Sequence, residues 1–182
     1  TGQEVCLYNR LGATDEAQQG FDFKITPGFH TPEWAKGAVM YQIFVDRFCN
    51  GDKSNDVETC EYVYIGRPVQ RVEDWGRNPS AMDVGYFYGG DLKGVRDKLD
   101  YIKSLGVEVI YLNPIFVSPS NHKYDCQDYE HIDPHFGRIV KDGGRLVDED
   151  ATDNQEAKKY VIRSAGRENL EASDAFFAEF VQ

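Results

Sequence analysis

Two stretches of the chain carry apolar residues on successive rather than alternate positions. They are residues 38–48, AVMYQIFVDRF, and residues 107–116, VEVIYLNPIF. Strands that are apolar on both faces are typical of sheets that helices cover on both sides. Between them, residues 89–106 have the period of a helix, which Asp91 can cap and Gly106 can end. Its apolar stripe consists of Leu92, Val95, Leu99 and Ile102.

The order strand, helix, strand predicts a parallel βαβ unit with a right-handed crossover. Such units build (β/α)₈ barrels and doubly wound sheets. In both architectures the chemistry lies just past the C-terminal ends of the strands. Two strands cannot close a barrel, so we expect the chain to be the front part of a longer protein.

The two ends of the chain predict different structures. Residues 21–25, FDFKI, alternate apolar and polar side chains, as a half-buried strand does. Residues 26–34 hold two prolines and a glycine, which is typical of a linker. We therefore expect residues 1–32 to be the end of a preceding β domain with its linker, and residues 33–182 to be an α/β domain. Residues 169–182 predict a helix with four apolar residues near one face, namely Leu170, Phe177, Phe180 and Val181.

The amino-acid composition and net charge restrict the classes of molecule that the chain is expected to bind. The chain is 41% hydrophobic and 28% charged, as ordinary globular proteins are. Acidic residues outnumber basic ones by 31 to 20, which gives a net charge of −11. Nucleic acids and anionic membranes bind patches of Lys and Arg, so we expect neither as a partner. A neutral substrate or a cation fits the charge better.

The four cysteines, Cys6, Cys49, Cys60 and Cys126, form no C-x-x-C pair. This spacing excludes a zinc ribbon and a thioredoxin-type motif. Cys49 and Cys60 could close a short loop as a disulfide, but the spacing favours four free thiols. The cellular compartment stays open, with a preference for the cytoplasm.

Oxygen-bearing side chains crowd residues 50–56, NGDKSND, just after the first predicted strand. Amide and carboxylate oxygens together are the ligands of calcium, although the same residue types also make plain turns. An EF-hand is excluded because the twelfth position of the loop lacks a glutamate. The candidate oxygens belong to Asn50, Asp52, Ser54, Asn55 and Asp56.

Residues 122–137, HKYDCQDYEHIDPHFG, have no periodic apolar face and follow the second predicted strand almost directly. His131, Asp133 and His135 alternate, as ligands of a metallohydrolase on an extended segment would. Pro134 lies inside this motif and no further Cys/His cluster completes it, so we favour histidines that are satisfied locally.

His122, Tyr124 and Asp125 allow another interpretation. The apolar face of a sugar ring stacks on an aromatic ring, and its hydroxyls bond carboxylates and imidazoles. A tyrosine between a histidine and an aspartate, near the C-terminal end of a strand, offers both kinds of contact. Simple packing of the loop is the alternative.

Four motifs within residues 34–137 together resemble the α-amylase superfamily, in particular its neopullulanase and cyclomaltodextrinase branch. In chain order they are YQIFVDRFCNGDKSND, FYGGDLKG, GVEVIYLNPIF and HKYDCQDYEHIDPHFG. The N-terminal tail resembles the end of a starch-binding β-sandwich module. Residues 62–84 and 138–168 depart from the family pattern, and we expect them to be insertions.

The resemblance implies the N-terminal portion of a TIM (β/α)₈ barrel that acts on α-glucan oligosaccharides by a retaining mechanism. The catalytic carboxylates of the family lie at the ends of later strands, so we expect them downstream of Gln182 and expect this chain to be inactive alone. His122, Tyr124 and Asp125 match the family's substrate-binding positions. The full-length protein is a possible homodimer.

The resemblance also implies a structural calcium ion. Its ligands would be side chains of residues 50–56 together with the backbone carbonyl of Gly89 and the carboxylate of Asp91. From residues 50–56 the implied ligands are Asn50, Asp52, Asn55 and Asp56.

Two other functions stay open at this point. One is a carbohydrate-binding or calcium-structured module without catalysis. The other is a metallohydrolase that uses His131, Asp133 and His135.

Overall fold

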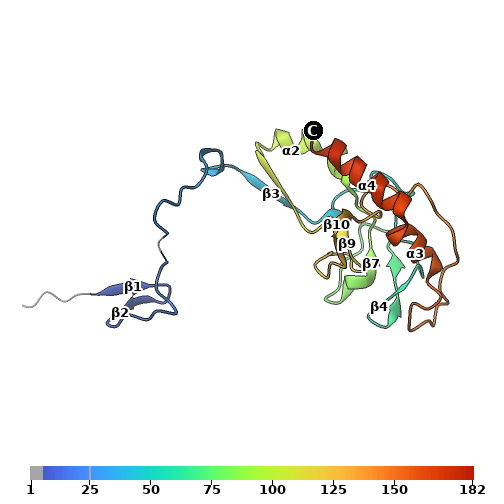
Figure 1. Ribbon diagram of the computed structural model, residues 1–182, viewed down its shortest axis with the longest axis horizontal. Coiled ribbons are helices and arrows are strands. Elements are labelled where there is room, and N and C mark those ends of the chain that lie inside the picture. Colours follow the sequence, from blue (N-terminus) through green and yellow to red (C-terminus); the bar gives the residue numbers. More distant parts are fainter. Residues whose placement is uncertain (1–5, 25) are drawn as a thin grey trace, which may run out of the picture. The chain divides into compact units, whose positions relative to one another are not determined.

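The computed structural model describes residues 6–24 and 26–182, and the chain divides into two units, residues 1–37 and residues 38–182. In the first unit, β1 (Leu7–Asn9) and β2 (Gly12–Thr14) form an antiparallel hairpin (Figure 1). A 3-10 helix follows at Glu33–Ala35. The hairpin does not test the prediction of a starch-binding β-sandwich, which stays a prediction.

The strand predicted for residues 21–25 is wrong for residues 21–24, and Ile25 lies outside the described residues. The backbone N–H groups of Phe21 and Asp22 both donate to the carbonyl of Gln18, which closes a turn. A strand needs a neighbouring strand for its hydrogen bonds, whereas alternation along the sequence shows only which faces would differ. The exposed ring of Phe23 stacks on Tyr8 instead, with 6.4 Å between ring centroids.

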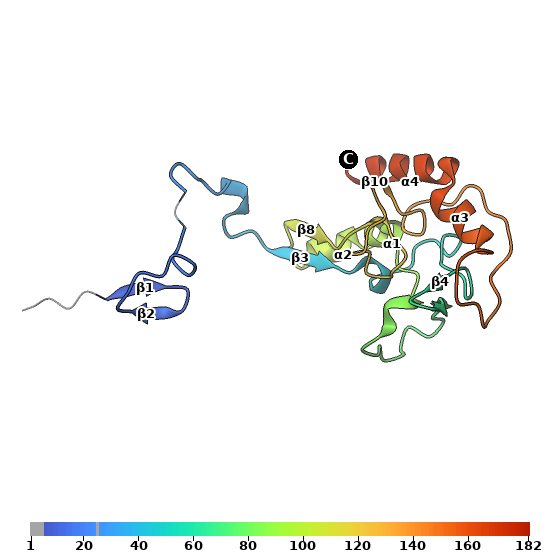
Figure 2. The ribbon, with the colours of Figure 1, turned by 60° about the horizontal axis from the view of Figure 1, so that its bottom comes forward.

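The βαβ prediction for the second unit is confirmed. β3 (Met40–Ile43) and β8 (Val109–Leu112) pair in parallel, with Met40 opposite Val109 and Ile43 opposite Leu112. The connection contains α1 (Leu92–Asp97) and α2 (Leu99–Ser104). Figure 2 shows the two strands side by side with both helices next to them.

Only one face of β3 is buried, contrary to the expectation of two. Ile43 packs with Leu92, Val95 and Ile102 of the connecting helices, whereas Met40 on the opposite face is exposed. The helices that the chain supplies therefore cover a single face of this strand pair.

The predicted single helix is broken at Lys98, which has φ −106° and ψ 6°. Asp91 caps its start, because its carboxylate accepts a hydrogen bond from the backbone N–H of Gly94 at 2.5 Å. Gly106 ends it with φ +77°, a left-handed conformation that favours glycine. Because of this break, the residues of α2 do not continue the apolar stripe that was predicted for one straight helix. Leu99 is 36% exposed, while Ile102 is buried.

The other elements complete a first core. β9 (Phe116–Val117) and β10 (Asp128–Ile132) pair antiparallel, and α4 (Arg167–Phe180) lies next to β10 (Figure 1). The C-terminal helix was predicted, but Phe176 is its buried apolar residue and Val181 is exposed. The helix α3 (Lys158–Ala165) was not predicted.

A second core joins the two segments that we expect to be insertions. β4 (Val63–Tyr64) and β5 (Arg67–Pro68) form a hairpin, and β6 (Gln70–Arg71) pairs in parallel with β7 (Tyr86–Phe87). Val63 and Val69 of this part pack in one cluster with Val147 and Ala157. The two segments thus depend on each other for burial, and their status as insertions stays a prediction.

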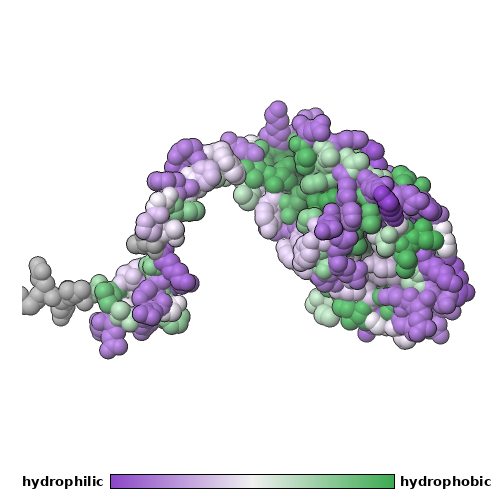
Figure 3. Space-filling view, in the orientation of Figure 1, coloured by the Kyte–Doolittle hydropathy of each residue, from purple (hydrophilic) through white to green (hydrophobic). Residues whose placement is uncertain are grey.

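An apolar groove remains open on the second unit. Figure 3 shows apolar residues (green) gathered between α2 and α4. The groove has a volume of about 420 Å³, and its lining includes Ile110, Leu112, Phe116, Phe177 and Phe180. It therefore lies where β8 meets α4.

Two further predictions concern the chain as a whole. All four cysteines are free thiols, as the spacing favoured, so the structure has no disulfide between Cys49 and Cys60. None of the helices in residues 6–24 and 26–182 combines the length and the apolar character that crossing a membrane requires.

Candidate substrate and calcium sites

The structure brings His122 and Tyr124 together. Lys123 between them has φ +59°, and this left-handed residue turns the chain so that the two rings lie on the same side. Their centroids are 5.9 Å apart, and the backbone N–H of Tyr124 donates to Nδ1 of His122 at 3.1 Å. Tyr124 is 59% exposed, so a flat apolar surface remains open to a ligand. We call residues 118–125 the substrate loop.

Asp125 anchors the substrate loop. Its Oδ1 accepts a hydrogen bond from Ser118 Oγ at 2.7 Å and another from the hydroxyl of Ser120. Its Oδ2 accepts one from the Tyr64 hydroxyl at 2.6 Å. Burial alone raises the pKa of Asp125, but these three donors outweigh it, so its pKa is lowered and the carboxylate is ionised at neutral pH.

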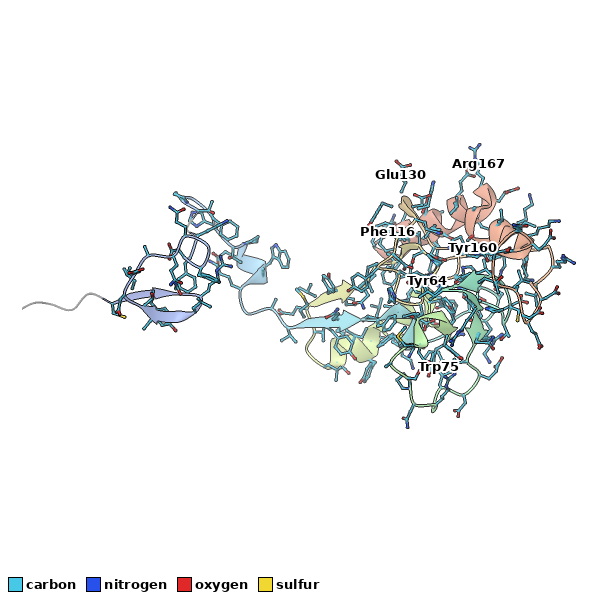
Figure 4. The ribbon with its side chains drawn as sticks, turned by 90° about the horizontal axis from the view of Figure 1, so that it is seen from below. Tyr64, Trp75, Phe116, Glu130, Tyr160 and Arg167 are labelled. Atoms are coloured by element: carbon cyan, nitrogen blue, oxygen red, sulfur yellow. The ribbon has the colours of Figure 1, made fainter. Side chains whose placement is uncertain are left out.

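The contact between Tyr64 and Asp125 crosses from the second core to the substrate loop. Burial, and then the hydrogen bond to Asp125, raise the pKa of Tyr64 to about 12, so the phenol stays protonated and donates. Figure 4 shows Tyr64 together with Tyr160, which stacks on Tyr62 with centroids 4.0 Å apart. The second core therefore helps to fix the position of Asp125.

Lys123 begins a buried chain of charges that runs beneath the substrate loop. Its ammonium group bonds Asp133 Oδ2 at 2.6 Å, and Asp133 Oδ1 lies 3.0 Å from Nδ1 of His135. Nε2 of His135 lies 2.8 Å from Glu61 Oε1, and the other oxygen of Glu61 pairs with Arg163. We call these five residues the buried charge chain.

The pKa values agree with alternating charges along this chain. Burial raises the pKa of Asp133, but Lys123 and His135 more than reverse the effect and hold it well below its usual range. Burial lowers the pKa of His135, but Glu61 and Asp133 outweigh burial, so the pKa is raised overall. His135 is therefore stabilised as a cation between two carboxylates.

The metallohydrolase alternative is contradicted. Nδ1 of His131 pairs with Asp174 of α4 at 2.7 Å, while Asp133 and His135 belong to the buried charge chain. Lys123 and His135 already occupy the two oxygens of Asp133, which leaves neither oxygen for a metal ion. In the described part of the chain, no three His, Cys, Asp or Glu side chains come together as metal ligands.

Because no such cluster of three side chains is found among the residues that the structure describes, the predicted calcium site could not rest on carboxylates alone. It would also need amide and backbone oxygens as ligands. Asn50 Nδ2 donates to Asp56 Oδ1 at 2.7 Å. A Cβ added to Gly89 would lie 2.5 Å from Asp56 Oδ1 and 2.6 Å from Asn50 Nδ2. Residues 50–56 and the segment before α1 thus meet closely at Gly89.

Two buried oxygens in this region fit a cation. Oδ1 of Asn50 and Oδ1 of Asn55 have no hydrogen-bond partner among the described residues. Leaving a buried acceptor without a partner costs about 1–3 kcal/mol. Burial also raises the pKa of Asp91, and it raises that of Asp56 to about 6, although Arg71 pairs with Asp56 Oδ2 at 2.8 Å. A divalent cation would bind the unpartnered oxygens and would also stabilise the ionised form of the buried carboxylates.

Asp52 of the predicted set also takes part in a local turn. Its Oδ1 accepts hydrogen bonds from the backbone N–H of Ser54 at 3.0 Å and from the Ser54 hydroxyl at 2.6 Å. Its backbone N–H donates to Asp91 Oδ2 at 2.8 Å. Asp52 therefore shapes the turn and has its second carboxylate oxygen left for a cation.

Sequence reasoning missed several residues that hold the site. Lys123 belonged to a motif singled out for its neighbours, and its left-handed backbone left no signal in the sequence. Glu61 and Arg163 are 102 positions apart, so no local pattern could link them. Tyr64 and Asp125, 61 positions apart, are a similar case.

Comparisons with known proteins agree with the motifs. Residues 42–154 match the family described as "Alpha amylase, catalytic domain". An amylopullulanase of Thermoanaerobacterium saccharolyticum is 51% identical over 140 residues, which cover 69% of this chain and 11% of that protein. Neopullulanase 2 of Thermoactinomyces vulgaris is 50% identical over 121 residues, 66% of this chain and 18% of that protein.

A solved structure is also similar. The type III pullulan hydrolase from Thermococcus kodakarensis superimposes with a TM-score of 0.53 at 43% identity, and the match covers 62% of this chain and 21% of that one. The chain thus spans between about a tenth and a fifth of the length of these relatives. Because the family match covers more than half of the chain, the chain belongs to the α-amylase family of glycoside hydrolases and has part of its TIM-barrel catalytic domain.

Proposed function

We propose that the full-length protein containing this chain is a retaining glycoside hydrolase that cleaves α-glucosidic bonds of starch-type glucans. The substrate loop carries this proposal. An exposed tyrosine lies beside a histidine, near the C-terminal end of a parallel strand pair, where barrel enzymes have their active sites. The matched relatives carry names that refer to pullulan and amylose-type substrates.

In this proposal each residue of the substrate loop has a distinct role. Tyr124 stacks on the glucosyl unit on the non-reducing side of the scissile bond. His122 lies beside it and has its Nε2 left for a sugar hydroxyl, because Nδ1 accepts the backbone N–H of Tyr124. Asp125 holds the loop in place, since Ser118, Ser120 and Tyr64 take three of its roughly four acceptor positions.

The nucleophile and the general acid of this proposal come from later barrel strands. A retaining glycosidase needs two carboxyl groups about 5–5.5 Å apart, one on each side of the bond. Further barrel elements would also cover the apolar groove between β8 and α4. The assay of the proposal is the release of reducing sugar from starch, pullulan and cyclodextrins by the full-length protein. Binding without hydrolysis would favour the non-catalytic carbohydrate-binding module.

We also propose that calcium binds between residues 50–56 and the segment that opens α1. Asn50 and Asn55 would offer their unpartnered amide oxygens, and Asp52, Asp56 and Asp91 their carboxylates, with the carbonyl of Gly89. The ion would have a structural role, because it would tie together segments that are more than thirty positions apart.

Tyr124→Ala is expected to lower kcat/KM on α-glucans by about tenfold, or about 1.4 kcal/mol of transition-state binding. Steady-state kinetics of the full-length variant and the unmodified protein measure this change in kcat/KM. Tyr129→Ala is the matched control, because Tyr129 is also exposed but lies on β10, outside the substrate loop. Equal kinetics for the two variants would show that Tyr124 does not contact the substrate.

A further inference from the structure

A pocket of about 590 Å³ adjoins the substrate loop. Three parts of the chain line it: the end of β3 with Phe44 and Arg47, the loop between β6 and β7 with Trp75 and Arg77, and Tyr88 directly after β7. Its wall also includes His122 of the substrate loop. The pocket has the size of a small-molecule site and shares His122 with the substrate loop.

Trp75 is held firmly in this pocket yet remains open to a ligand. Its ring meets that of Tyr88 edge to face, with centroids 5.8 Å apart and an interplanar angle of 87°. Tyr88 is buried, its hydroxyl donates to the carbonyl of Arg77 at 3.1 Å, and the guanidinium group of Arg47 covers its ring at 4.1 Å. Trp75 itself is 40% exposed, on the loop where Figure 4 labels it.

The charges of the pocket favour an uncharged ligand. Arg47 pairs with Asp46 at 3.0 Å, and Arg77 pairs with Asp83 at 3.4 Å. Each arginine therefore has a carboxylate partner, and the pocket offers no net positive charge to a phosphate or a carboxylate. An exposed indole with polar groups around it suits a pyranose ring, which has an apolar C–H face and a rim of hydroxyls.

We propose that this pocket is a further glucosyl subsite, in which Trp75 stacks on a sugar unit beyond the one that Tyr124 holds. The proposal rests on the proposed function and adds a specificity determinant to it. His122 lines the pocket and its ring lies 5.9 Å from that of Tyr124, so one α-glucan chain can occupy both positions. Only substrates long enough to reach Trp75 gain from it, and the residue would set the preference for chain length.

The test is a series of maltooligosaccharides from three to seven glucose units, hydrolysed by the full-length protein. Trp75→Ala is expected to lower kcat/KM on the longest members by about tenfold and to leave the shortest unchanged. Trp75→Phe should restore most of the loss, because a ring remains to stack. Trp34→Ala, which changes the chain's other tryptophan, should leave the length profile unchanged.

Two results would overturn the subsite. A loss that is the same for every chain length would assign Trp75 a purely structural role, and no loss at any length would show that the pocket is not used. Tyr124→Ala should reduce activity on all lengths, which separates the two sites. If the full-length protein hydrolyses no α-glucan, the proposed function fails. Calorimetric titration with maltoheptaose then tests the pocket separately, because the subsite requires weaker binding by Trp75→Ala than by the unmodified protein.

Discussion

Glu61→Gln is expected to lower the free energy of unfolding by about 3–5 kcal/mol, the usual cost of removing one partner from a buried ion pair. Glu61 is fully buried and joins His135 to Arg163, which is equally buried. The substitution keeps the shape of the side chain but leaves two cations without their shared carboxylate. Urea unfolding of the full-length protein, followed by circular dichroism, measures the change.

The control is an exposed ion pair of similar geometry. Lys141 and Glu168 are 2.8 Å apart, and more than half of each side chain is exposed. Glu168→Gln should therefore change the free energy of unfolding far less than Glu61→Gln does. The double variant Glu61→Leu with Arg163→Met should be less destabilised than Glu61→Gln, because Arg163 no longer stays buried as an unpaired charge and His135 keeps Asp133. Equal costs for Glu61→Gln and Glu168→Gln would contradict the assignment.

The buried charge chain should stabilise the protein only within a limited pH range. The pKa of Glu61 is lowered on folding, because His135 and Arg163 outweigh the effect of burial. Its contribution is therefore present above the usual carboxylate pKa and is lost as the pH falls through the lowered value. The pKa of His135 is raised, so its contribution is present below the usual histidine pKa and is lost as the pH rises through the raised value. The difference between the protein and Glu61→Gln should be largest between these limits.

Much of the barrel portion could be predicted, because its signals are local. The strands β3 and β8 follow from two apolar runs, and the ends of the helical connection follow from Asp91 and Gly106. The position of the substrate loop follows from its place after a strand. The break at Lys98 could not be predicted, since the apolar period continues through it and only packing decides where the helix turns.

The parts that failed or were missed depend on partners distant in the sequence. Residues 21–24 alternate as a strand does, but no strand pairs with them in the described part of the first unit. The second core needs residues 62–84 and 138–168 together, because Val63 and Val69 of the first segment pack against Val147 and Ala157 of the second. The alternation of His131, Asp133 and His135 was real, but their partners Asp174, Lys123 and Glu61 determine what each side chain does.

Calcium at a hundredfold excess over its Kd is expected to stabilise the protein by about 2.7 kcal/mol against unfolding. The physical reason lies in the oxygens of Asn50 and Asn55, which are buried without a hydrogen-bond partner in the described chain, and in the burial of Asp56 and Asp91. A cation in this place would bind the two amide oxygens and neutralise the two buried carboxylates. Thermal melts after treatment with a chelator, with and without added calcium, measure the shift.

Two variants with the same change of charge make this experiment specific. Asp52→Ala removes a proposed ligand, whereas Asp150→Ala removes an exposed carboxylate far along the chain in residues 138–168. The calcium-dependent shift in Tm should shrink for Asp52→Ala and stay the same for Asp150→Ala, whatever either variant does to the basal Tm. Magnesium should give a smaller shift, because it requires near-octahedral geometry at shorter distances. An unchanged Tm on adding calcium would mean that the loop is a turn held by its own hydrogen bonds, among them those that Asp91 accepts from Gly51, Asp52 and Gly94.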